Sequence, residues 1–190
     1  MEKAKRSTKK KTNYFIRGKN DEYNTPEIAY NPIRYLSNFL FNKTIWDPFV
    51  SEKPTAKDRI KKMFPVSKEV IHDRTFDLLT FKLPERFDII ITNPPFSKKK
   101  EIIQQLFILD KPFCCLLPFD VLSRKYMMVE LQTRENLHVI LPSQRFDFES
   151  VYEKETDQKK KKSTCPFSSI WLCYKCPQPN NPHISLFIWP

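Results

Sequence analysis

Short apolar segments alternate with amphipathic ones along most of this 190-residue chain, and that alternation restricts its fold more than any other feature. Short apolar runs between turn-forming residues predict buried strands, whereas apolar residues three and four positions apart predict helices. Strands that alternate with helices form a mostly parallel sheet with helices on both faces. Strands are predicted within 43–47, 68–73, 76–81, 86–92, 112–118, 137–142, 168–175 and 184–189, and helices within 26–41, 55–64, 100–109 and 120–132.

The last two predicted strands, 168–175 and 184–189, are separated by the turn-forming segment CPQPNNPH and by no helix. We therefore expect them to pair antiparallel at one edge of the sheet. A chain of this length supports one α/β domain with a proper core. We assign residues 21–190 to that domain and the lysine-rich residues 1–20 to a flexible basic arm.

The chain carries a net charge of +11, from 33 lysines and arginines against 22 acidic residues. Such an excess is typical of proteins that bind a polyanion, although a solvated lysine-rich surface has the same composition. No apolar run is long enough to cross a bilayer, and the basic N-terminus lacks the apolar core of a secretory signal. Five cysteines in no disulfide-like pattern favour an intracellular, reducing compartment.

The segment DIIITNPPF (88–96) ends a buried strand at a fixed point, because Pro94 and Pro95 have no N–H to continue a ladder. The amide oxygen of Asn93 and the carbonyl of Pro94 can accept hydrogen bonds from an exocyclic amine. Phe96 offers a flat surface to an unstacked or flipped base. In the alternative interpretation, the prolines only terminate the strand and Phe96 packs into the core.

Acidic residues follow several predicted strands, at the sheet edge where parallel α/β folds bind ligands. Asp47 and Asp73 come directly after two strands, and Asp77 opens the next. Their carboxylates suit the ribose hydroxyls and the amine of a nucleoside-bearing cofactor. Each of them singly is more typical of a turn or a helix cap, and it is their alignment on one edge that favours a cofactor site.

The tetrad NPPF after an apolar strand resembles the catalytic motif of adenine-N6 DNA methyltransferases, in which Asn or Asp precedes two prolines and an aromatic residue. Two further segments occur in the family's order, DEYNTPE (21–27) and IWDPF (45–49), and Asp77 precedes the tetrad as the family's acid does. The resemblance covers about residues 20–176. It is strongest to the short, EcoRI-type and phage- or virus-encoded members.

This resemblance implies a Rossmann-like class I methyltransferase fold that uses S-adenosylmethionine and no metal. The residues implied in cofactor binding are Thr25 and Pro26 at the methionine end, Asp47, Pro48 and Phe49 in the cofactor loop, Asp73 at the ribose, and Phe76 or Asp77 at the adenine. Those implied in catalysis are Asn93, Pro94, Pro95 and Phe96.

One position departs from the family pattern. After IWDPF the family has a glycine that lets the backbone approach the cofactor, whereas this chain has Lys53 there and a single glycine, Gly18, in its whole length. A catalytically inactive copy with a structural or nucleic-acid-binding role is therefore the alternative to an active enzyme. The intact tetrad favours the enzyme.

Basic residues are predicted around the mouth of the site, where they would contact phosphates without reading sequence. They are Lys98, Lys99, Lys100, Arg145, Lys159, Lys160, Lys161 and Lys162. No separate target-recognition domain is visible, so specificity is modest or is supplied by a protein partner or larger assembly. Cys165, Cys173, Cys176 and His183 lack the paired spacing of a zinc site, and His72 reads as a satisfied core histidine.

The predicted function is transfer of a methyl group from S-adenosylmethionine to adenine N6 in DNA. RNA adenine and protein glutamine stay open as alternative substrates, and the excess of basic charge favours nucleic acid. No membrane association is expected. A viral origin would place the protein in the virion or in the host nucleus or cytoplasm.

Overall fold

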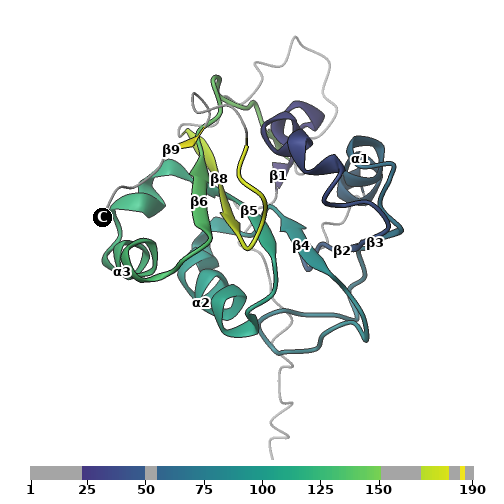
Figure 1. Ribbon diagram of the computed structural model, residues 1–190, viewed down its shortest axis with the longest axis horizontal. Coiled ribbons are helices and arrows are strands. Elements are labelled where there is room, and N and C mark those ends of the chain that lie inside the picture. Colours follow the sequence, from purple (N-terminus) through teal and green to yellow (C-terminus); the bar gives the residue numbers. More distant parts are fainter. Residues whose placement is uncertain (1–22, 50–54, 151–167, 180–184, 187–190) are drawn as a thin grey trace, which may run out of the picture.

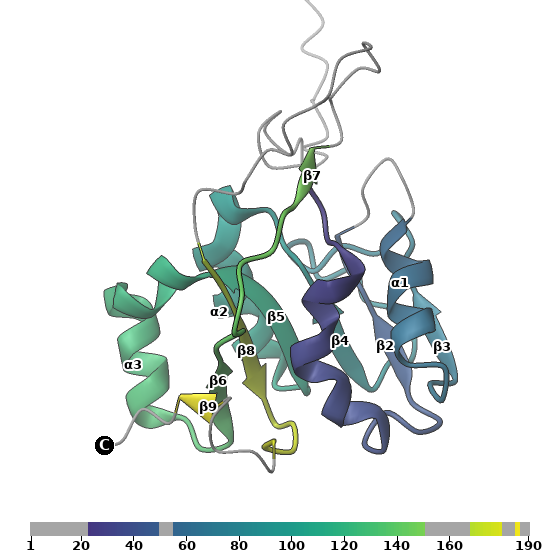
Figure 2. The same ribbon diagram turned by 90° about the horizontal axis from the view of Figure 1, so that it is seen from above.

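The computed structural model describes residues 23–49, 55–150, 168–179 and 185–186. The predictions made for the arm 1–20, for Lys53 and for Lys159–Lys162 lie outside these residues. Within them, seven strands form one sheet in the order β3-β2-β4-β5-β8-β6-β9 (Figure 1). Strand β1 pairs with β7 in a separate two-stranded sheet, and β7 is labelled in Figure 2.

The strands are β1 (Tyr23–Asn24), β2 (Thr44–Trp46), β3 (Glu69–Ile71), β4 (Ile89–Thr92), β5 (Phe113–Pro118), β6 (Leu137–Ile140), β7 (Glu149–Ser150), β8 (Ser169–Tyr174) and β9 (Ser185–Leu186). The α-helices are α1 (Thr55–Met63), α2 (Lys99–Leu109) and α3 (Lys125–Thr133). The 3-10 helices are η1 (Glu27–Ser37), η2 (Phe96–Lys98) and η3 (Phe119–Ser123). No helix in these described ranges is long and apolar enough to span a membrane.

Helices cover both faces of the main sheet, as the sequence predicts. Successive strand residues point to opposite faces, so Ile89 packs in one core cluster and Ile90 in the other. The first cluster lies under η1 and α1, and the second under α2 and α3, on the other side of the sheet (Figure 1). The predicted Rossmann-like α/β class, mostly parallel with antiparallel strands toward one edge, is confirmed.

The sheet reverses its winding direction between β2 and β4. From β2 the chain passes through α1 to β3 on one side, and from β4 it passes through α2 to β5 on the other, with all three pairings parallel. In open α/β sheets, ligands bind at the carboxyl ends of the strands that flank such a switch point. The fold alone therefore directs attention to the residues that follow β2 and β4.

The pairing of the C-terminal strands differs from the predicted edge hairpin. Strand β8 lies between β5 and β6 and is antiparallel to both, while β9 pairs with β6 and does not pair with β8. All six residues of β8 are buried, which suits an interior strand better than an edge strand. The apolar run SIWLCY already carries that signal, but the short turn after it suggests a hairpin.

The predicted strand 76–81 is wrong, because Asp77 uses its backbone and side chain to form a turn. Its N–H and C=O both bond to Lys82, and its carboxylate accepts from the N–H of Leu79 at 2.9 Å. Phe81 then takes a positive φ of 55°. The predicted helix 120–132 is divided into η3 and α3 at Arg124, whose backbone is extended.

Candidate functional site

Asp47 and Thr92 join the two strands at the switch point. Asp47 directly follows β2, Thr92 ends β4, and the Thr92 hydroxyl donates to Asp47 Oδ1 at 2.5 Å. Asp47 is only 3% exposed, and its Oδ1 also accepts from the N–H of Phe49 at 3.4 Å. A buried carboxylate with these donors is held in one orientation at the carboxyl edge of the sheet.

Asn93 follows Thr92, and the nitrogen and the oxygen of its side-chain amide differ in their hydrogen bonding. Its Nδ2 donates to the Thr25 hydroxyl at 2.9 Å, and Thr25 is itself buried. Its Oδ1 is buried and accepts no hydrogen bond from any residue that the structure describes. Because an unpaired buried acceptor costs about 1–3 kcal/mol, an oxygen fixed in this way is suited to a donor from a ligand.

The two prolines are buried, and Phe96 beyond them is partly exposed rather than enclosed in the core. The carbonyl of Pro95 accepts from the N–H of Lys98 at 3.1 Å, so the chain turns at once into η2 and then α2. The tetrad therefore forms a stiff corner between β4 and α2. An aromatic ring with an accessible surface lies at its end.

Thr25 is brought to this corner by the segment that connects β1 to η1. Arg59 of α1 donates to the Thr25 carbonyl, and Pro26 precedes the first turn of η1. The neighbouring Tyr30 is fully buried; burial raises its pKa, and the Asp47 charge raises it further. Thr25, Asp47 and Asn93, three of the predicted site residues, are thus gathered by contacts among η1, β2 and β4.

The other acids predicted at the cofactor are used in local turns. Asp73 is exposed and accepts hydrogen bonds from the side chain and the N–H of Thr75, which lower its pKa. Asp77 stabilises the turn at Leu79, and Phe76 packs against the second core cluster. Asp73 follows β3, next to β2, but no hydrogen bond joins it to Asp47 within the described ranges.

His72 differs from its interpretation as a satisfied core histidine. Its side chain is 1% exposed, and its Nδ1 lies 3.2 Å from Asp47 Oδ2. That approach does not have hydrogen-bond geometry, and among the described residues neither ring nitrogen has a hydrogen-bond partner. The signal in the sequence is the position of His72 at the end of β3, one strand away from Asp47.

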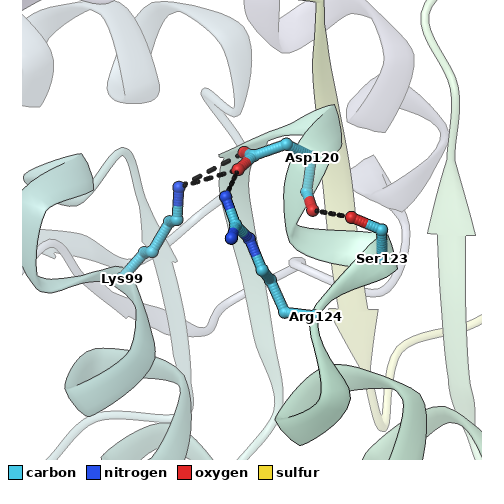
Figure 3. Close-up of polar contacts among 4 residues, drawn as sticks. All are labelled: Lys99, Asp120, Ser123 and Arg124. Atoms are coloured by element: carbon cyan, nitrogen blue, oxygen red, sulfur yellow. Dashed lines mark hydrogen bonds and ion pairs between the residues drawn. The ribbon is translucent and has the colours of Figure 1, made fainter.

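Lys99 and Arg124 share one carboxylate beside the tetrad (Figure 3). Lys99 Nζ lies 3.2 Å from both oxygens of Asp120, and Arg124 Nη2 lies 2.5 Å from Oδ2. Lys98, Lys100 and Arg145 are exposed, and their contact with phosphates stays a prediction. Sequence reasoning missed Asp120 and Arg124, although an acid and a base four residues apart directly after a strand were visible.

The cysteines of the described ranges do not form a metal site. No group of three or more His, Cys, Asp or Glu residues in those ranges could hold an ion, and Cys165 and His183 lie outside them. Cys173 and Cys176 are buried, and Cys176 Sγ lies 3.7 Å from Cys114 Sγ. Burial raises the pKa of the Cys173 thiol, so it stays protonated at neutral pH.

No family model and no curated protein sequence matches the chain. Solved structures with a similar fold include an S-adenosylmethionine-dependent O-methyltransferase from Thermotoga maritima, with 10% identity, a TM-score of 0.42, and 77% of this chain and 64% of that chain covered. The 23S rRNA methyltransferase ErmE has 10% identity, a TM-score of 0.43 and coverages of 77% and 68%. An rRNA methylase from Streptococcus thermophilus has 11% identity, a TM-score of 0.37 and coverages of 80% and 98%.

The chain spans 64% of the length of the O-methyltransferase that it matches. Overlaps this partial assign no substrate. The reaction proposed below rests on the geometry at the carboxyl ends of β2 and β4.

Proposed function

We propose that the chain is an S-adenosylmethionine-dependent methyltransferase that acts on the N6 amine of adenine in DNA. The observation that supports this most is the side-chain amide of Asn93, whose Nδ2 donates to Thr25 while its buried Oδ1 accepts nothing within the described part of the chain. An acceptor fixed in this way at a topological switch point is suited to the exocyclic amine of a base.

In this reaction, Asn93 Oδ1 and the Pro94 carbonyl each accept a hydrogen bond from the target amine. These bonds draw the nitrogen lone pair out of conjugation with the ring and stabilise the positive charge that develops on nitrogen. Phe96 stacks on the extruded base and offsets its lost stacking. The amine nitrogen would take the methyl group as its bond to sulfur breaks and a neutral thioether leaves, and the methylated nitrogen would then lose one of its protons to solvent.

S-Adenosylmethionine would supply an electrophilic methyl group. The buried carboxylate of Asp47 fits the cationic methionine amine of such a cofactor, and Phe49 and Phe76 are partly buried apolar side chains suited to its adenine. Asp73 accepts a hydrogen bond from Thr75 and follows β3, the neighbour of β2. It is the proposed partner of the cofactor's ribose. Thr25 and Pro26 complete the proposed set.

Methyl transfer with labelled S-adenosylmethionine tests the proposal directly. We expect adenine-containing duplex DNA to be labelled, and Asn93→Ala to lower the rate by about a hundredfold or more, as loss of a transition-state acceptor does in other enzymes. The matched control is Asn38→Ala, an exposed asparagine at the far end of η1, which should transfer methyl groups at the unsubstituted rate. Transfer that survives Asn93→Ala would refute the mechanism.

Two further experiments distinguish DNA from RNA as the substrate and an enzyme from an inactive copy. Single-stranded RNA of the same sequence in place of DNA distinguishes an RNA enzyme from a DNA enzyme. Calorimetric titration of the unsubstituted protein with S-adenosylmethionine distinguishes an enzyme from an inactive copy. We expect heat of binding, and its absence would favour a protein that keeps the fold without the reaction.

A further inference from the structure

The chain after β5 presents an aromatic ring and two cations beside the proposed active site. Strand β5 pairs with β4, so η3 follows the strand next to the one that leads into Asn93. Phe119, the first residue of η3, is 45% exposed. The N–H of Phe119 donates to the carbonyl of Ser168 at 2.8 Å, and this bond fixes the backbone of Phe119.

Asp120 holds Lys99 and Arg124 together at this edge (Figure 3). Partial burial raises the pKa of Asp120, but hydrogen bonds from Arg124 and Lys99 outweigh that effect and lower it. Asp120 is therefore ionised at neutral pH. Because two cations share one carboxylate, the three side chains together keep a net positive charge.

Stabilisation of the fold does not account for the pairing of Arg124 with Asp120. The Arg124 side chain is 53% exposed, and pairs as exposed as this one stabilise a fold very little. Nor does Arg124 extend a helix begun by Asp120, because its backbone is extended between η3 and α3. Among the described residues, Asp120 is the only acceptor of the Arg124 guanidinium, which leaves Nε and Nη1 for another anion.

We propose that Lys99 and Arg124, oriented by Asp120, bind a backbone phosphate that flanks the target adenine, and that Phe119 stacks on the neighbouring base. This inference rests on the proposed function. A guanidinium matches the geometry of a phosphate, and Lys99 adds a point charge. Extrusion of one base leaves its neighbour without a stacking partner, which an exposed ring one strand away can replace.

Binding of a fluorescently labelled, adenine-containing single-stranded DNA, measured by anisotropy without cofactor over a salt series, tests the site. Arg124→Ala should weaken binding about tenfold and lower the slope of log K against log salt by about 0.7, the value of one lost phosphate contact. Phe119→Ala should weaken binding about fivefold or more with an unchanged slope.

Arg34→Ala is the matched control, because Arg34 is exposed in the last turn of η1, near the start of β2. It removes the same charge on the other face of the sheet and should leave the slope unchanged. The melting temperatures of all variants should agree with that of the unsubstituted protein. An Arg124→Ala slope equal to that of Arg34→Ala would overturn the inference.

A neutral methylphosphonate at each of the two phosphates that flank the adenine locates the contact. At one of these positions, the modification should weaken binding of the unsubstituted protein about as much as Arg124→Ala weakens binding to unmodified DNA. The same modification should weaken binding of the Arg124→Ala variant little further. If Arg124→Ala weakens binding to both methylphosphonate DNAs as much as it weakens binding to unmodified DNA, Arg124 does not contact either of these phosphates. Failure of the proposed function has a separate signature, namely absent methyl transfer together with binding that still depends on Arg124.

Discussion

Asn93 depends on Thr25 for its orientation, and that dependence can be measured. Thr25→Val keeps the shape of the side chain but removes the hydroxyl that accepts from Asn93 Nδ2. Because one hydrogen bond contributes about 1.4 kcal/mol, we expect kcat for methyl transfer to fall about tenfold. Thr25→Ser should restore most of the rate. A normal kcat with only a raised KM for S-adenosylmethionine would show that Thr25 serves the cofactor and does not orient Asn93.

Single residues also show how far sequence reasoning reaches at the site. Asp47 and Asn93 were predictable, because strand periodicity locates strand ends and parallel strands bring their carboxyl ends together. The approach of His72 to Asp47 and the contact of Lys99 with Asp120 join segments that follow different strands. Such contacts depend on strand order, which the local pattern of the sequence does not specify.

The helix η1 positions Thr25, and Trp171 of β8 holds η1 on the sheet. Trp171 is fully buried, and its Nε1 donates to the Ala29 carbonyl at 2.8 Å. Trp171→Phe leaves that carbonyl unpaired and removes buried volume, so the free energy of unfolding should fall by about 2–4 kcal/mol in urea denaturation. Phe41→Leu, at a side chain 71% exposed, should change it by less than about 0.5 kcal/mol. Equal effects would show that Trp171 does not hold η1.

At the same scale, most elements follow from periodicity, and the exceptions have local causes. Segment 76–81 has the apolar content of a strand, but the Asp77 carboxylate bonds to the Leu79 N–H and stabilises a turn instead. The interior position of β8 depends on burial of both its faces, between β5 and β6. A local pattern predicts that a strand exists but not which strands it will pair with.

The stability of the whole domain should depend on pH through His138. This residue of β6 is 3% exposed, and burial lowers its pKa from 6.5 to about 4, so the folded state binds fewer protons than the unfolded state between these values. Stability is then fully present above pH 6.5 and is lost as the pH falls toward 4. Between pH 7 and pH 5 the loss from His138 alone should be about 2 kcal/mol.

Urea denaturation at both pH values, with His138→Gln as the comparison, measures this contribution. The variant removes the titrating ring but keeps a polar group near the Tyr35 hydroxyl, which lies 3.2 Å from His138 Nε2. We expect its stability to change about 2 kcal/mol less between the two pH values than that of the unsubstituted protein. An identical pH dependence would mean that other groups account for the effect.

The place of β8 has a consequence for the order in which the molecule can assemble. A ribosome that has synthesised residues up to 150 has already produced β5 and β6, but not the strand that lies between them. Until residues 169–174 emerge, β5 has an open apolar edge and β6 has no neighbour in the main sheet. This half of the domain therefore closes late in synthesis, and nascent chains that stall before β8 should be the ones that need chaperones.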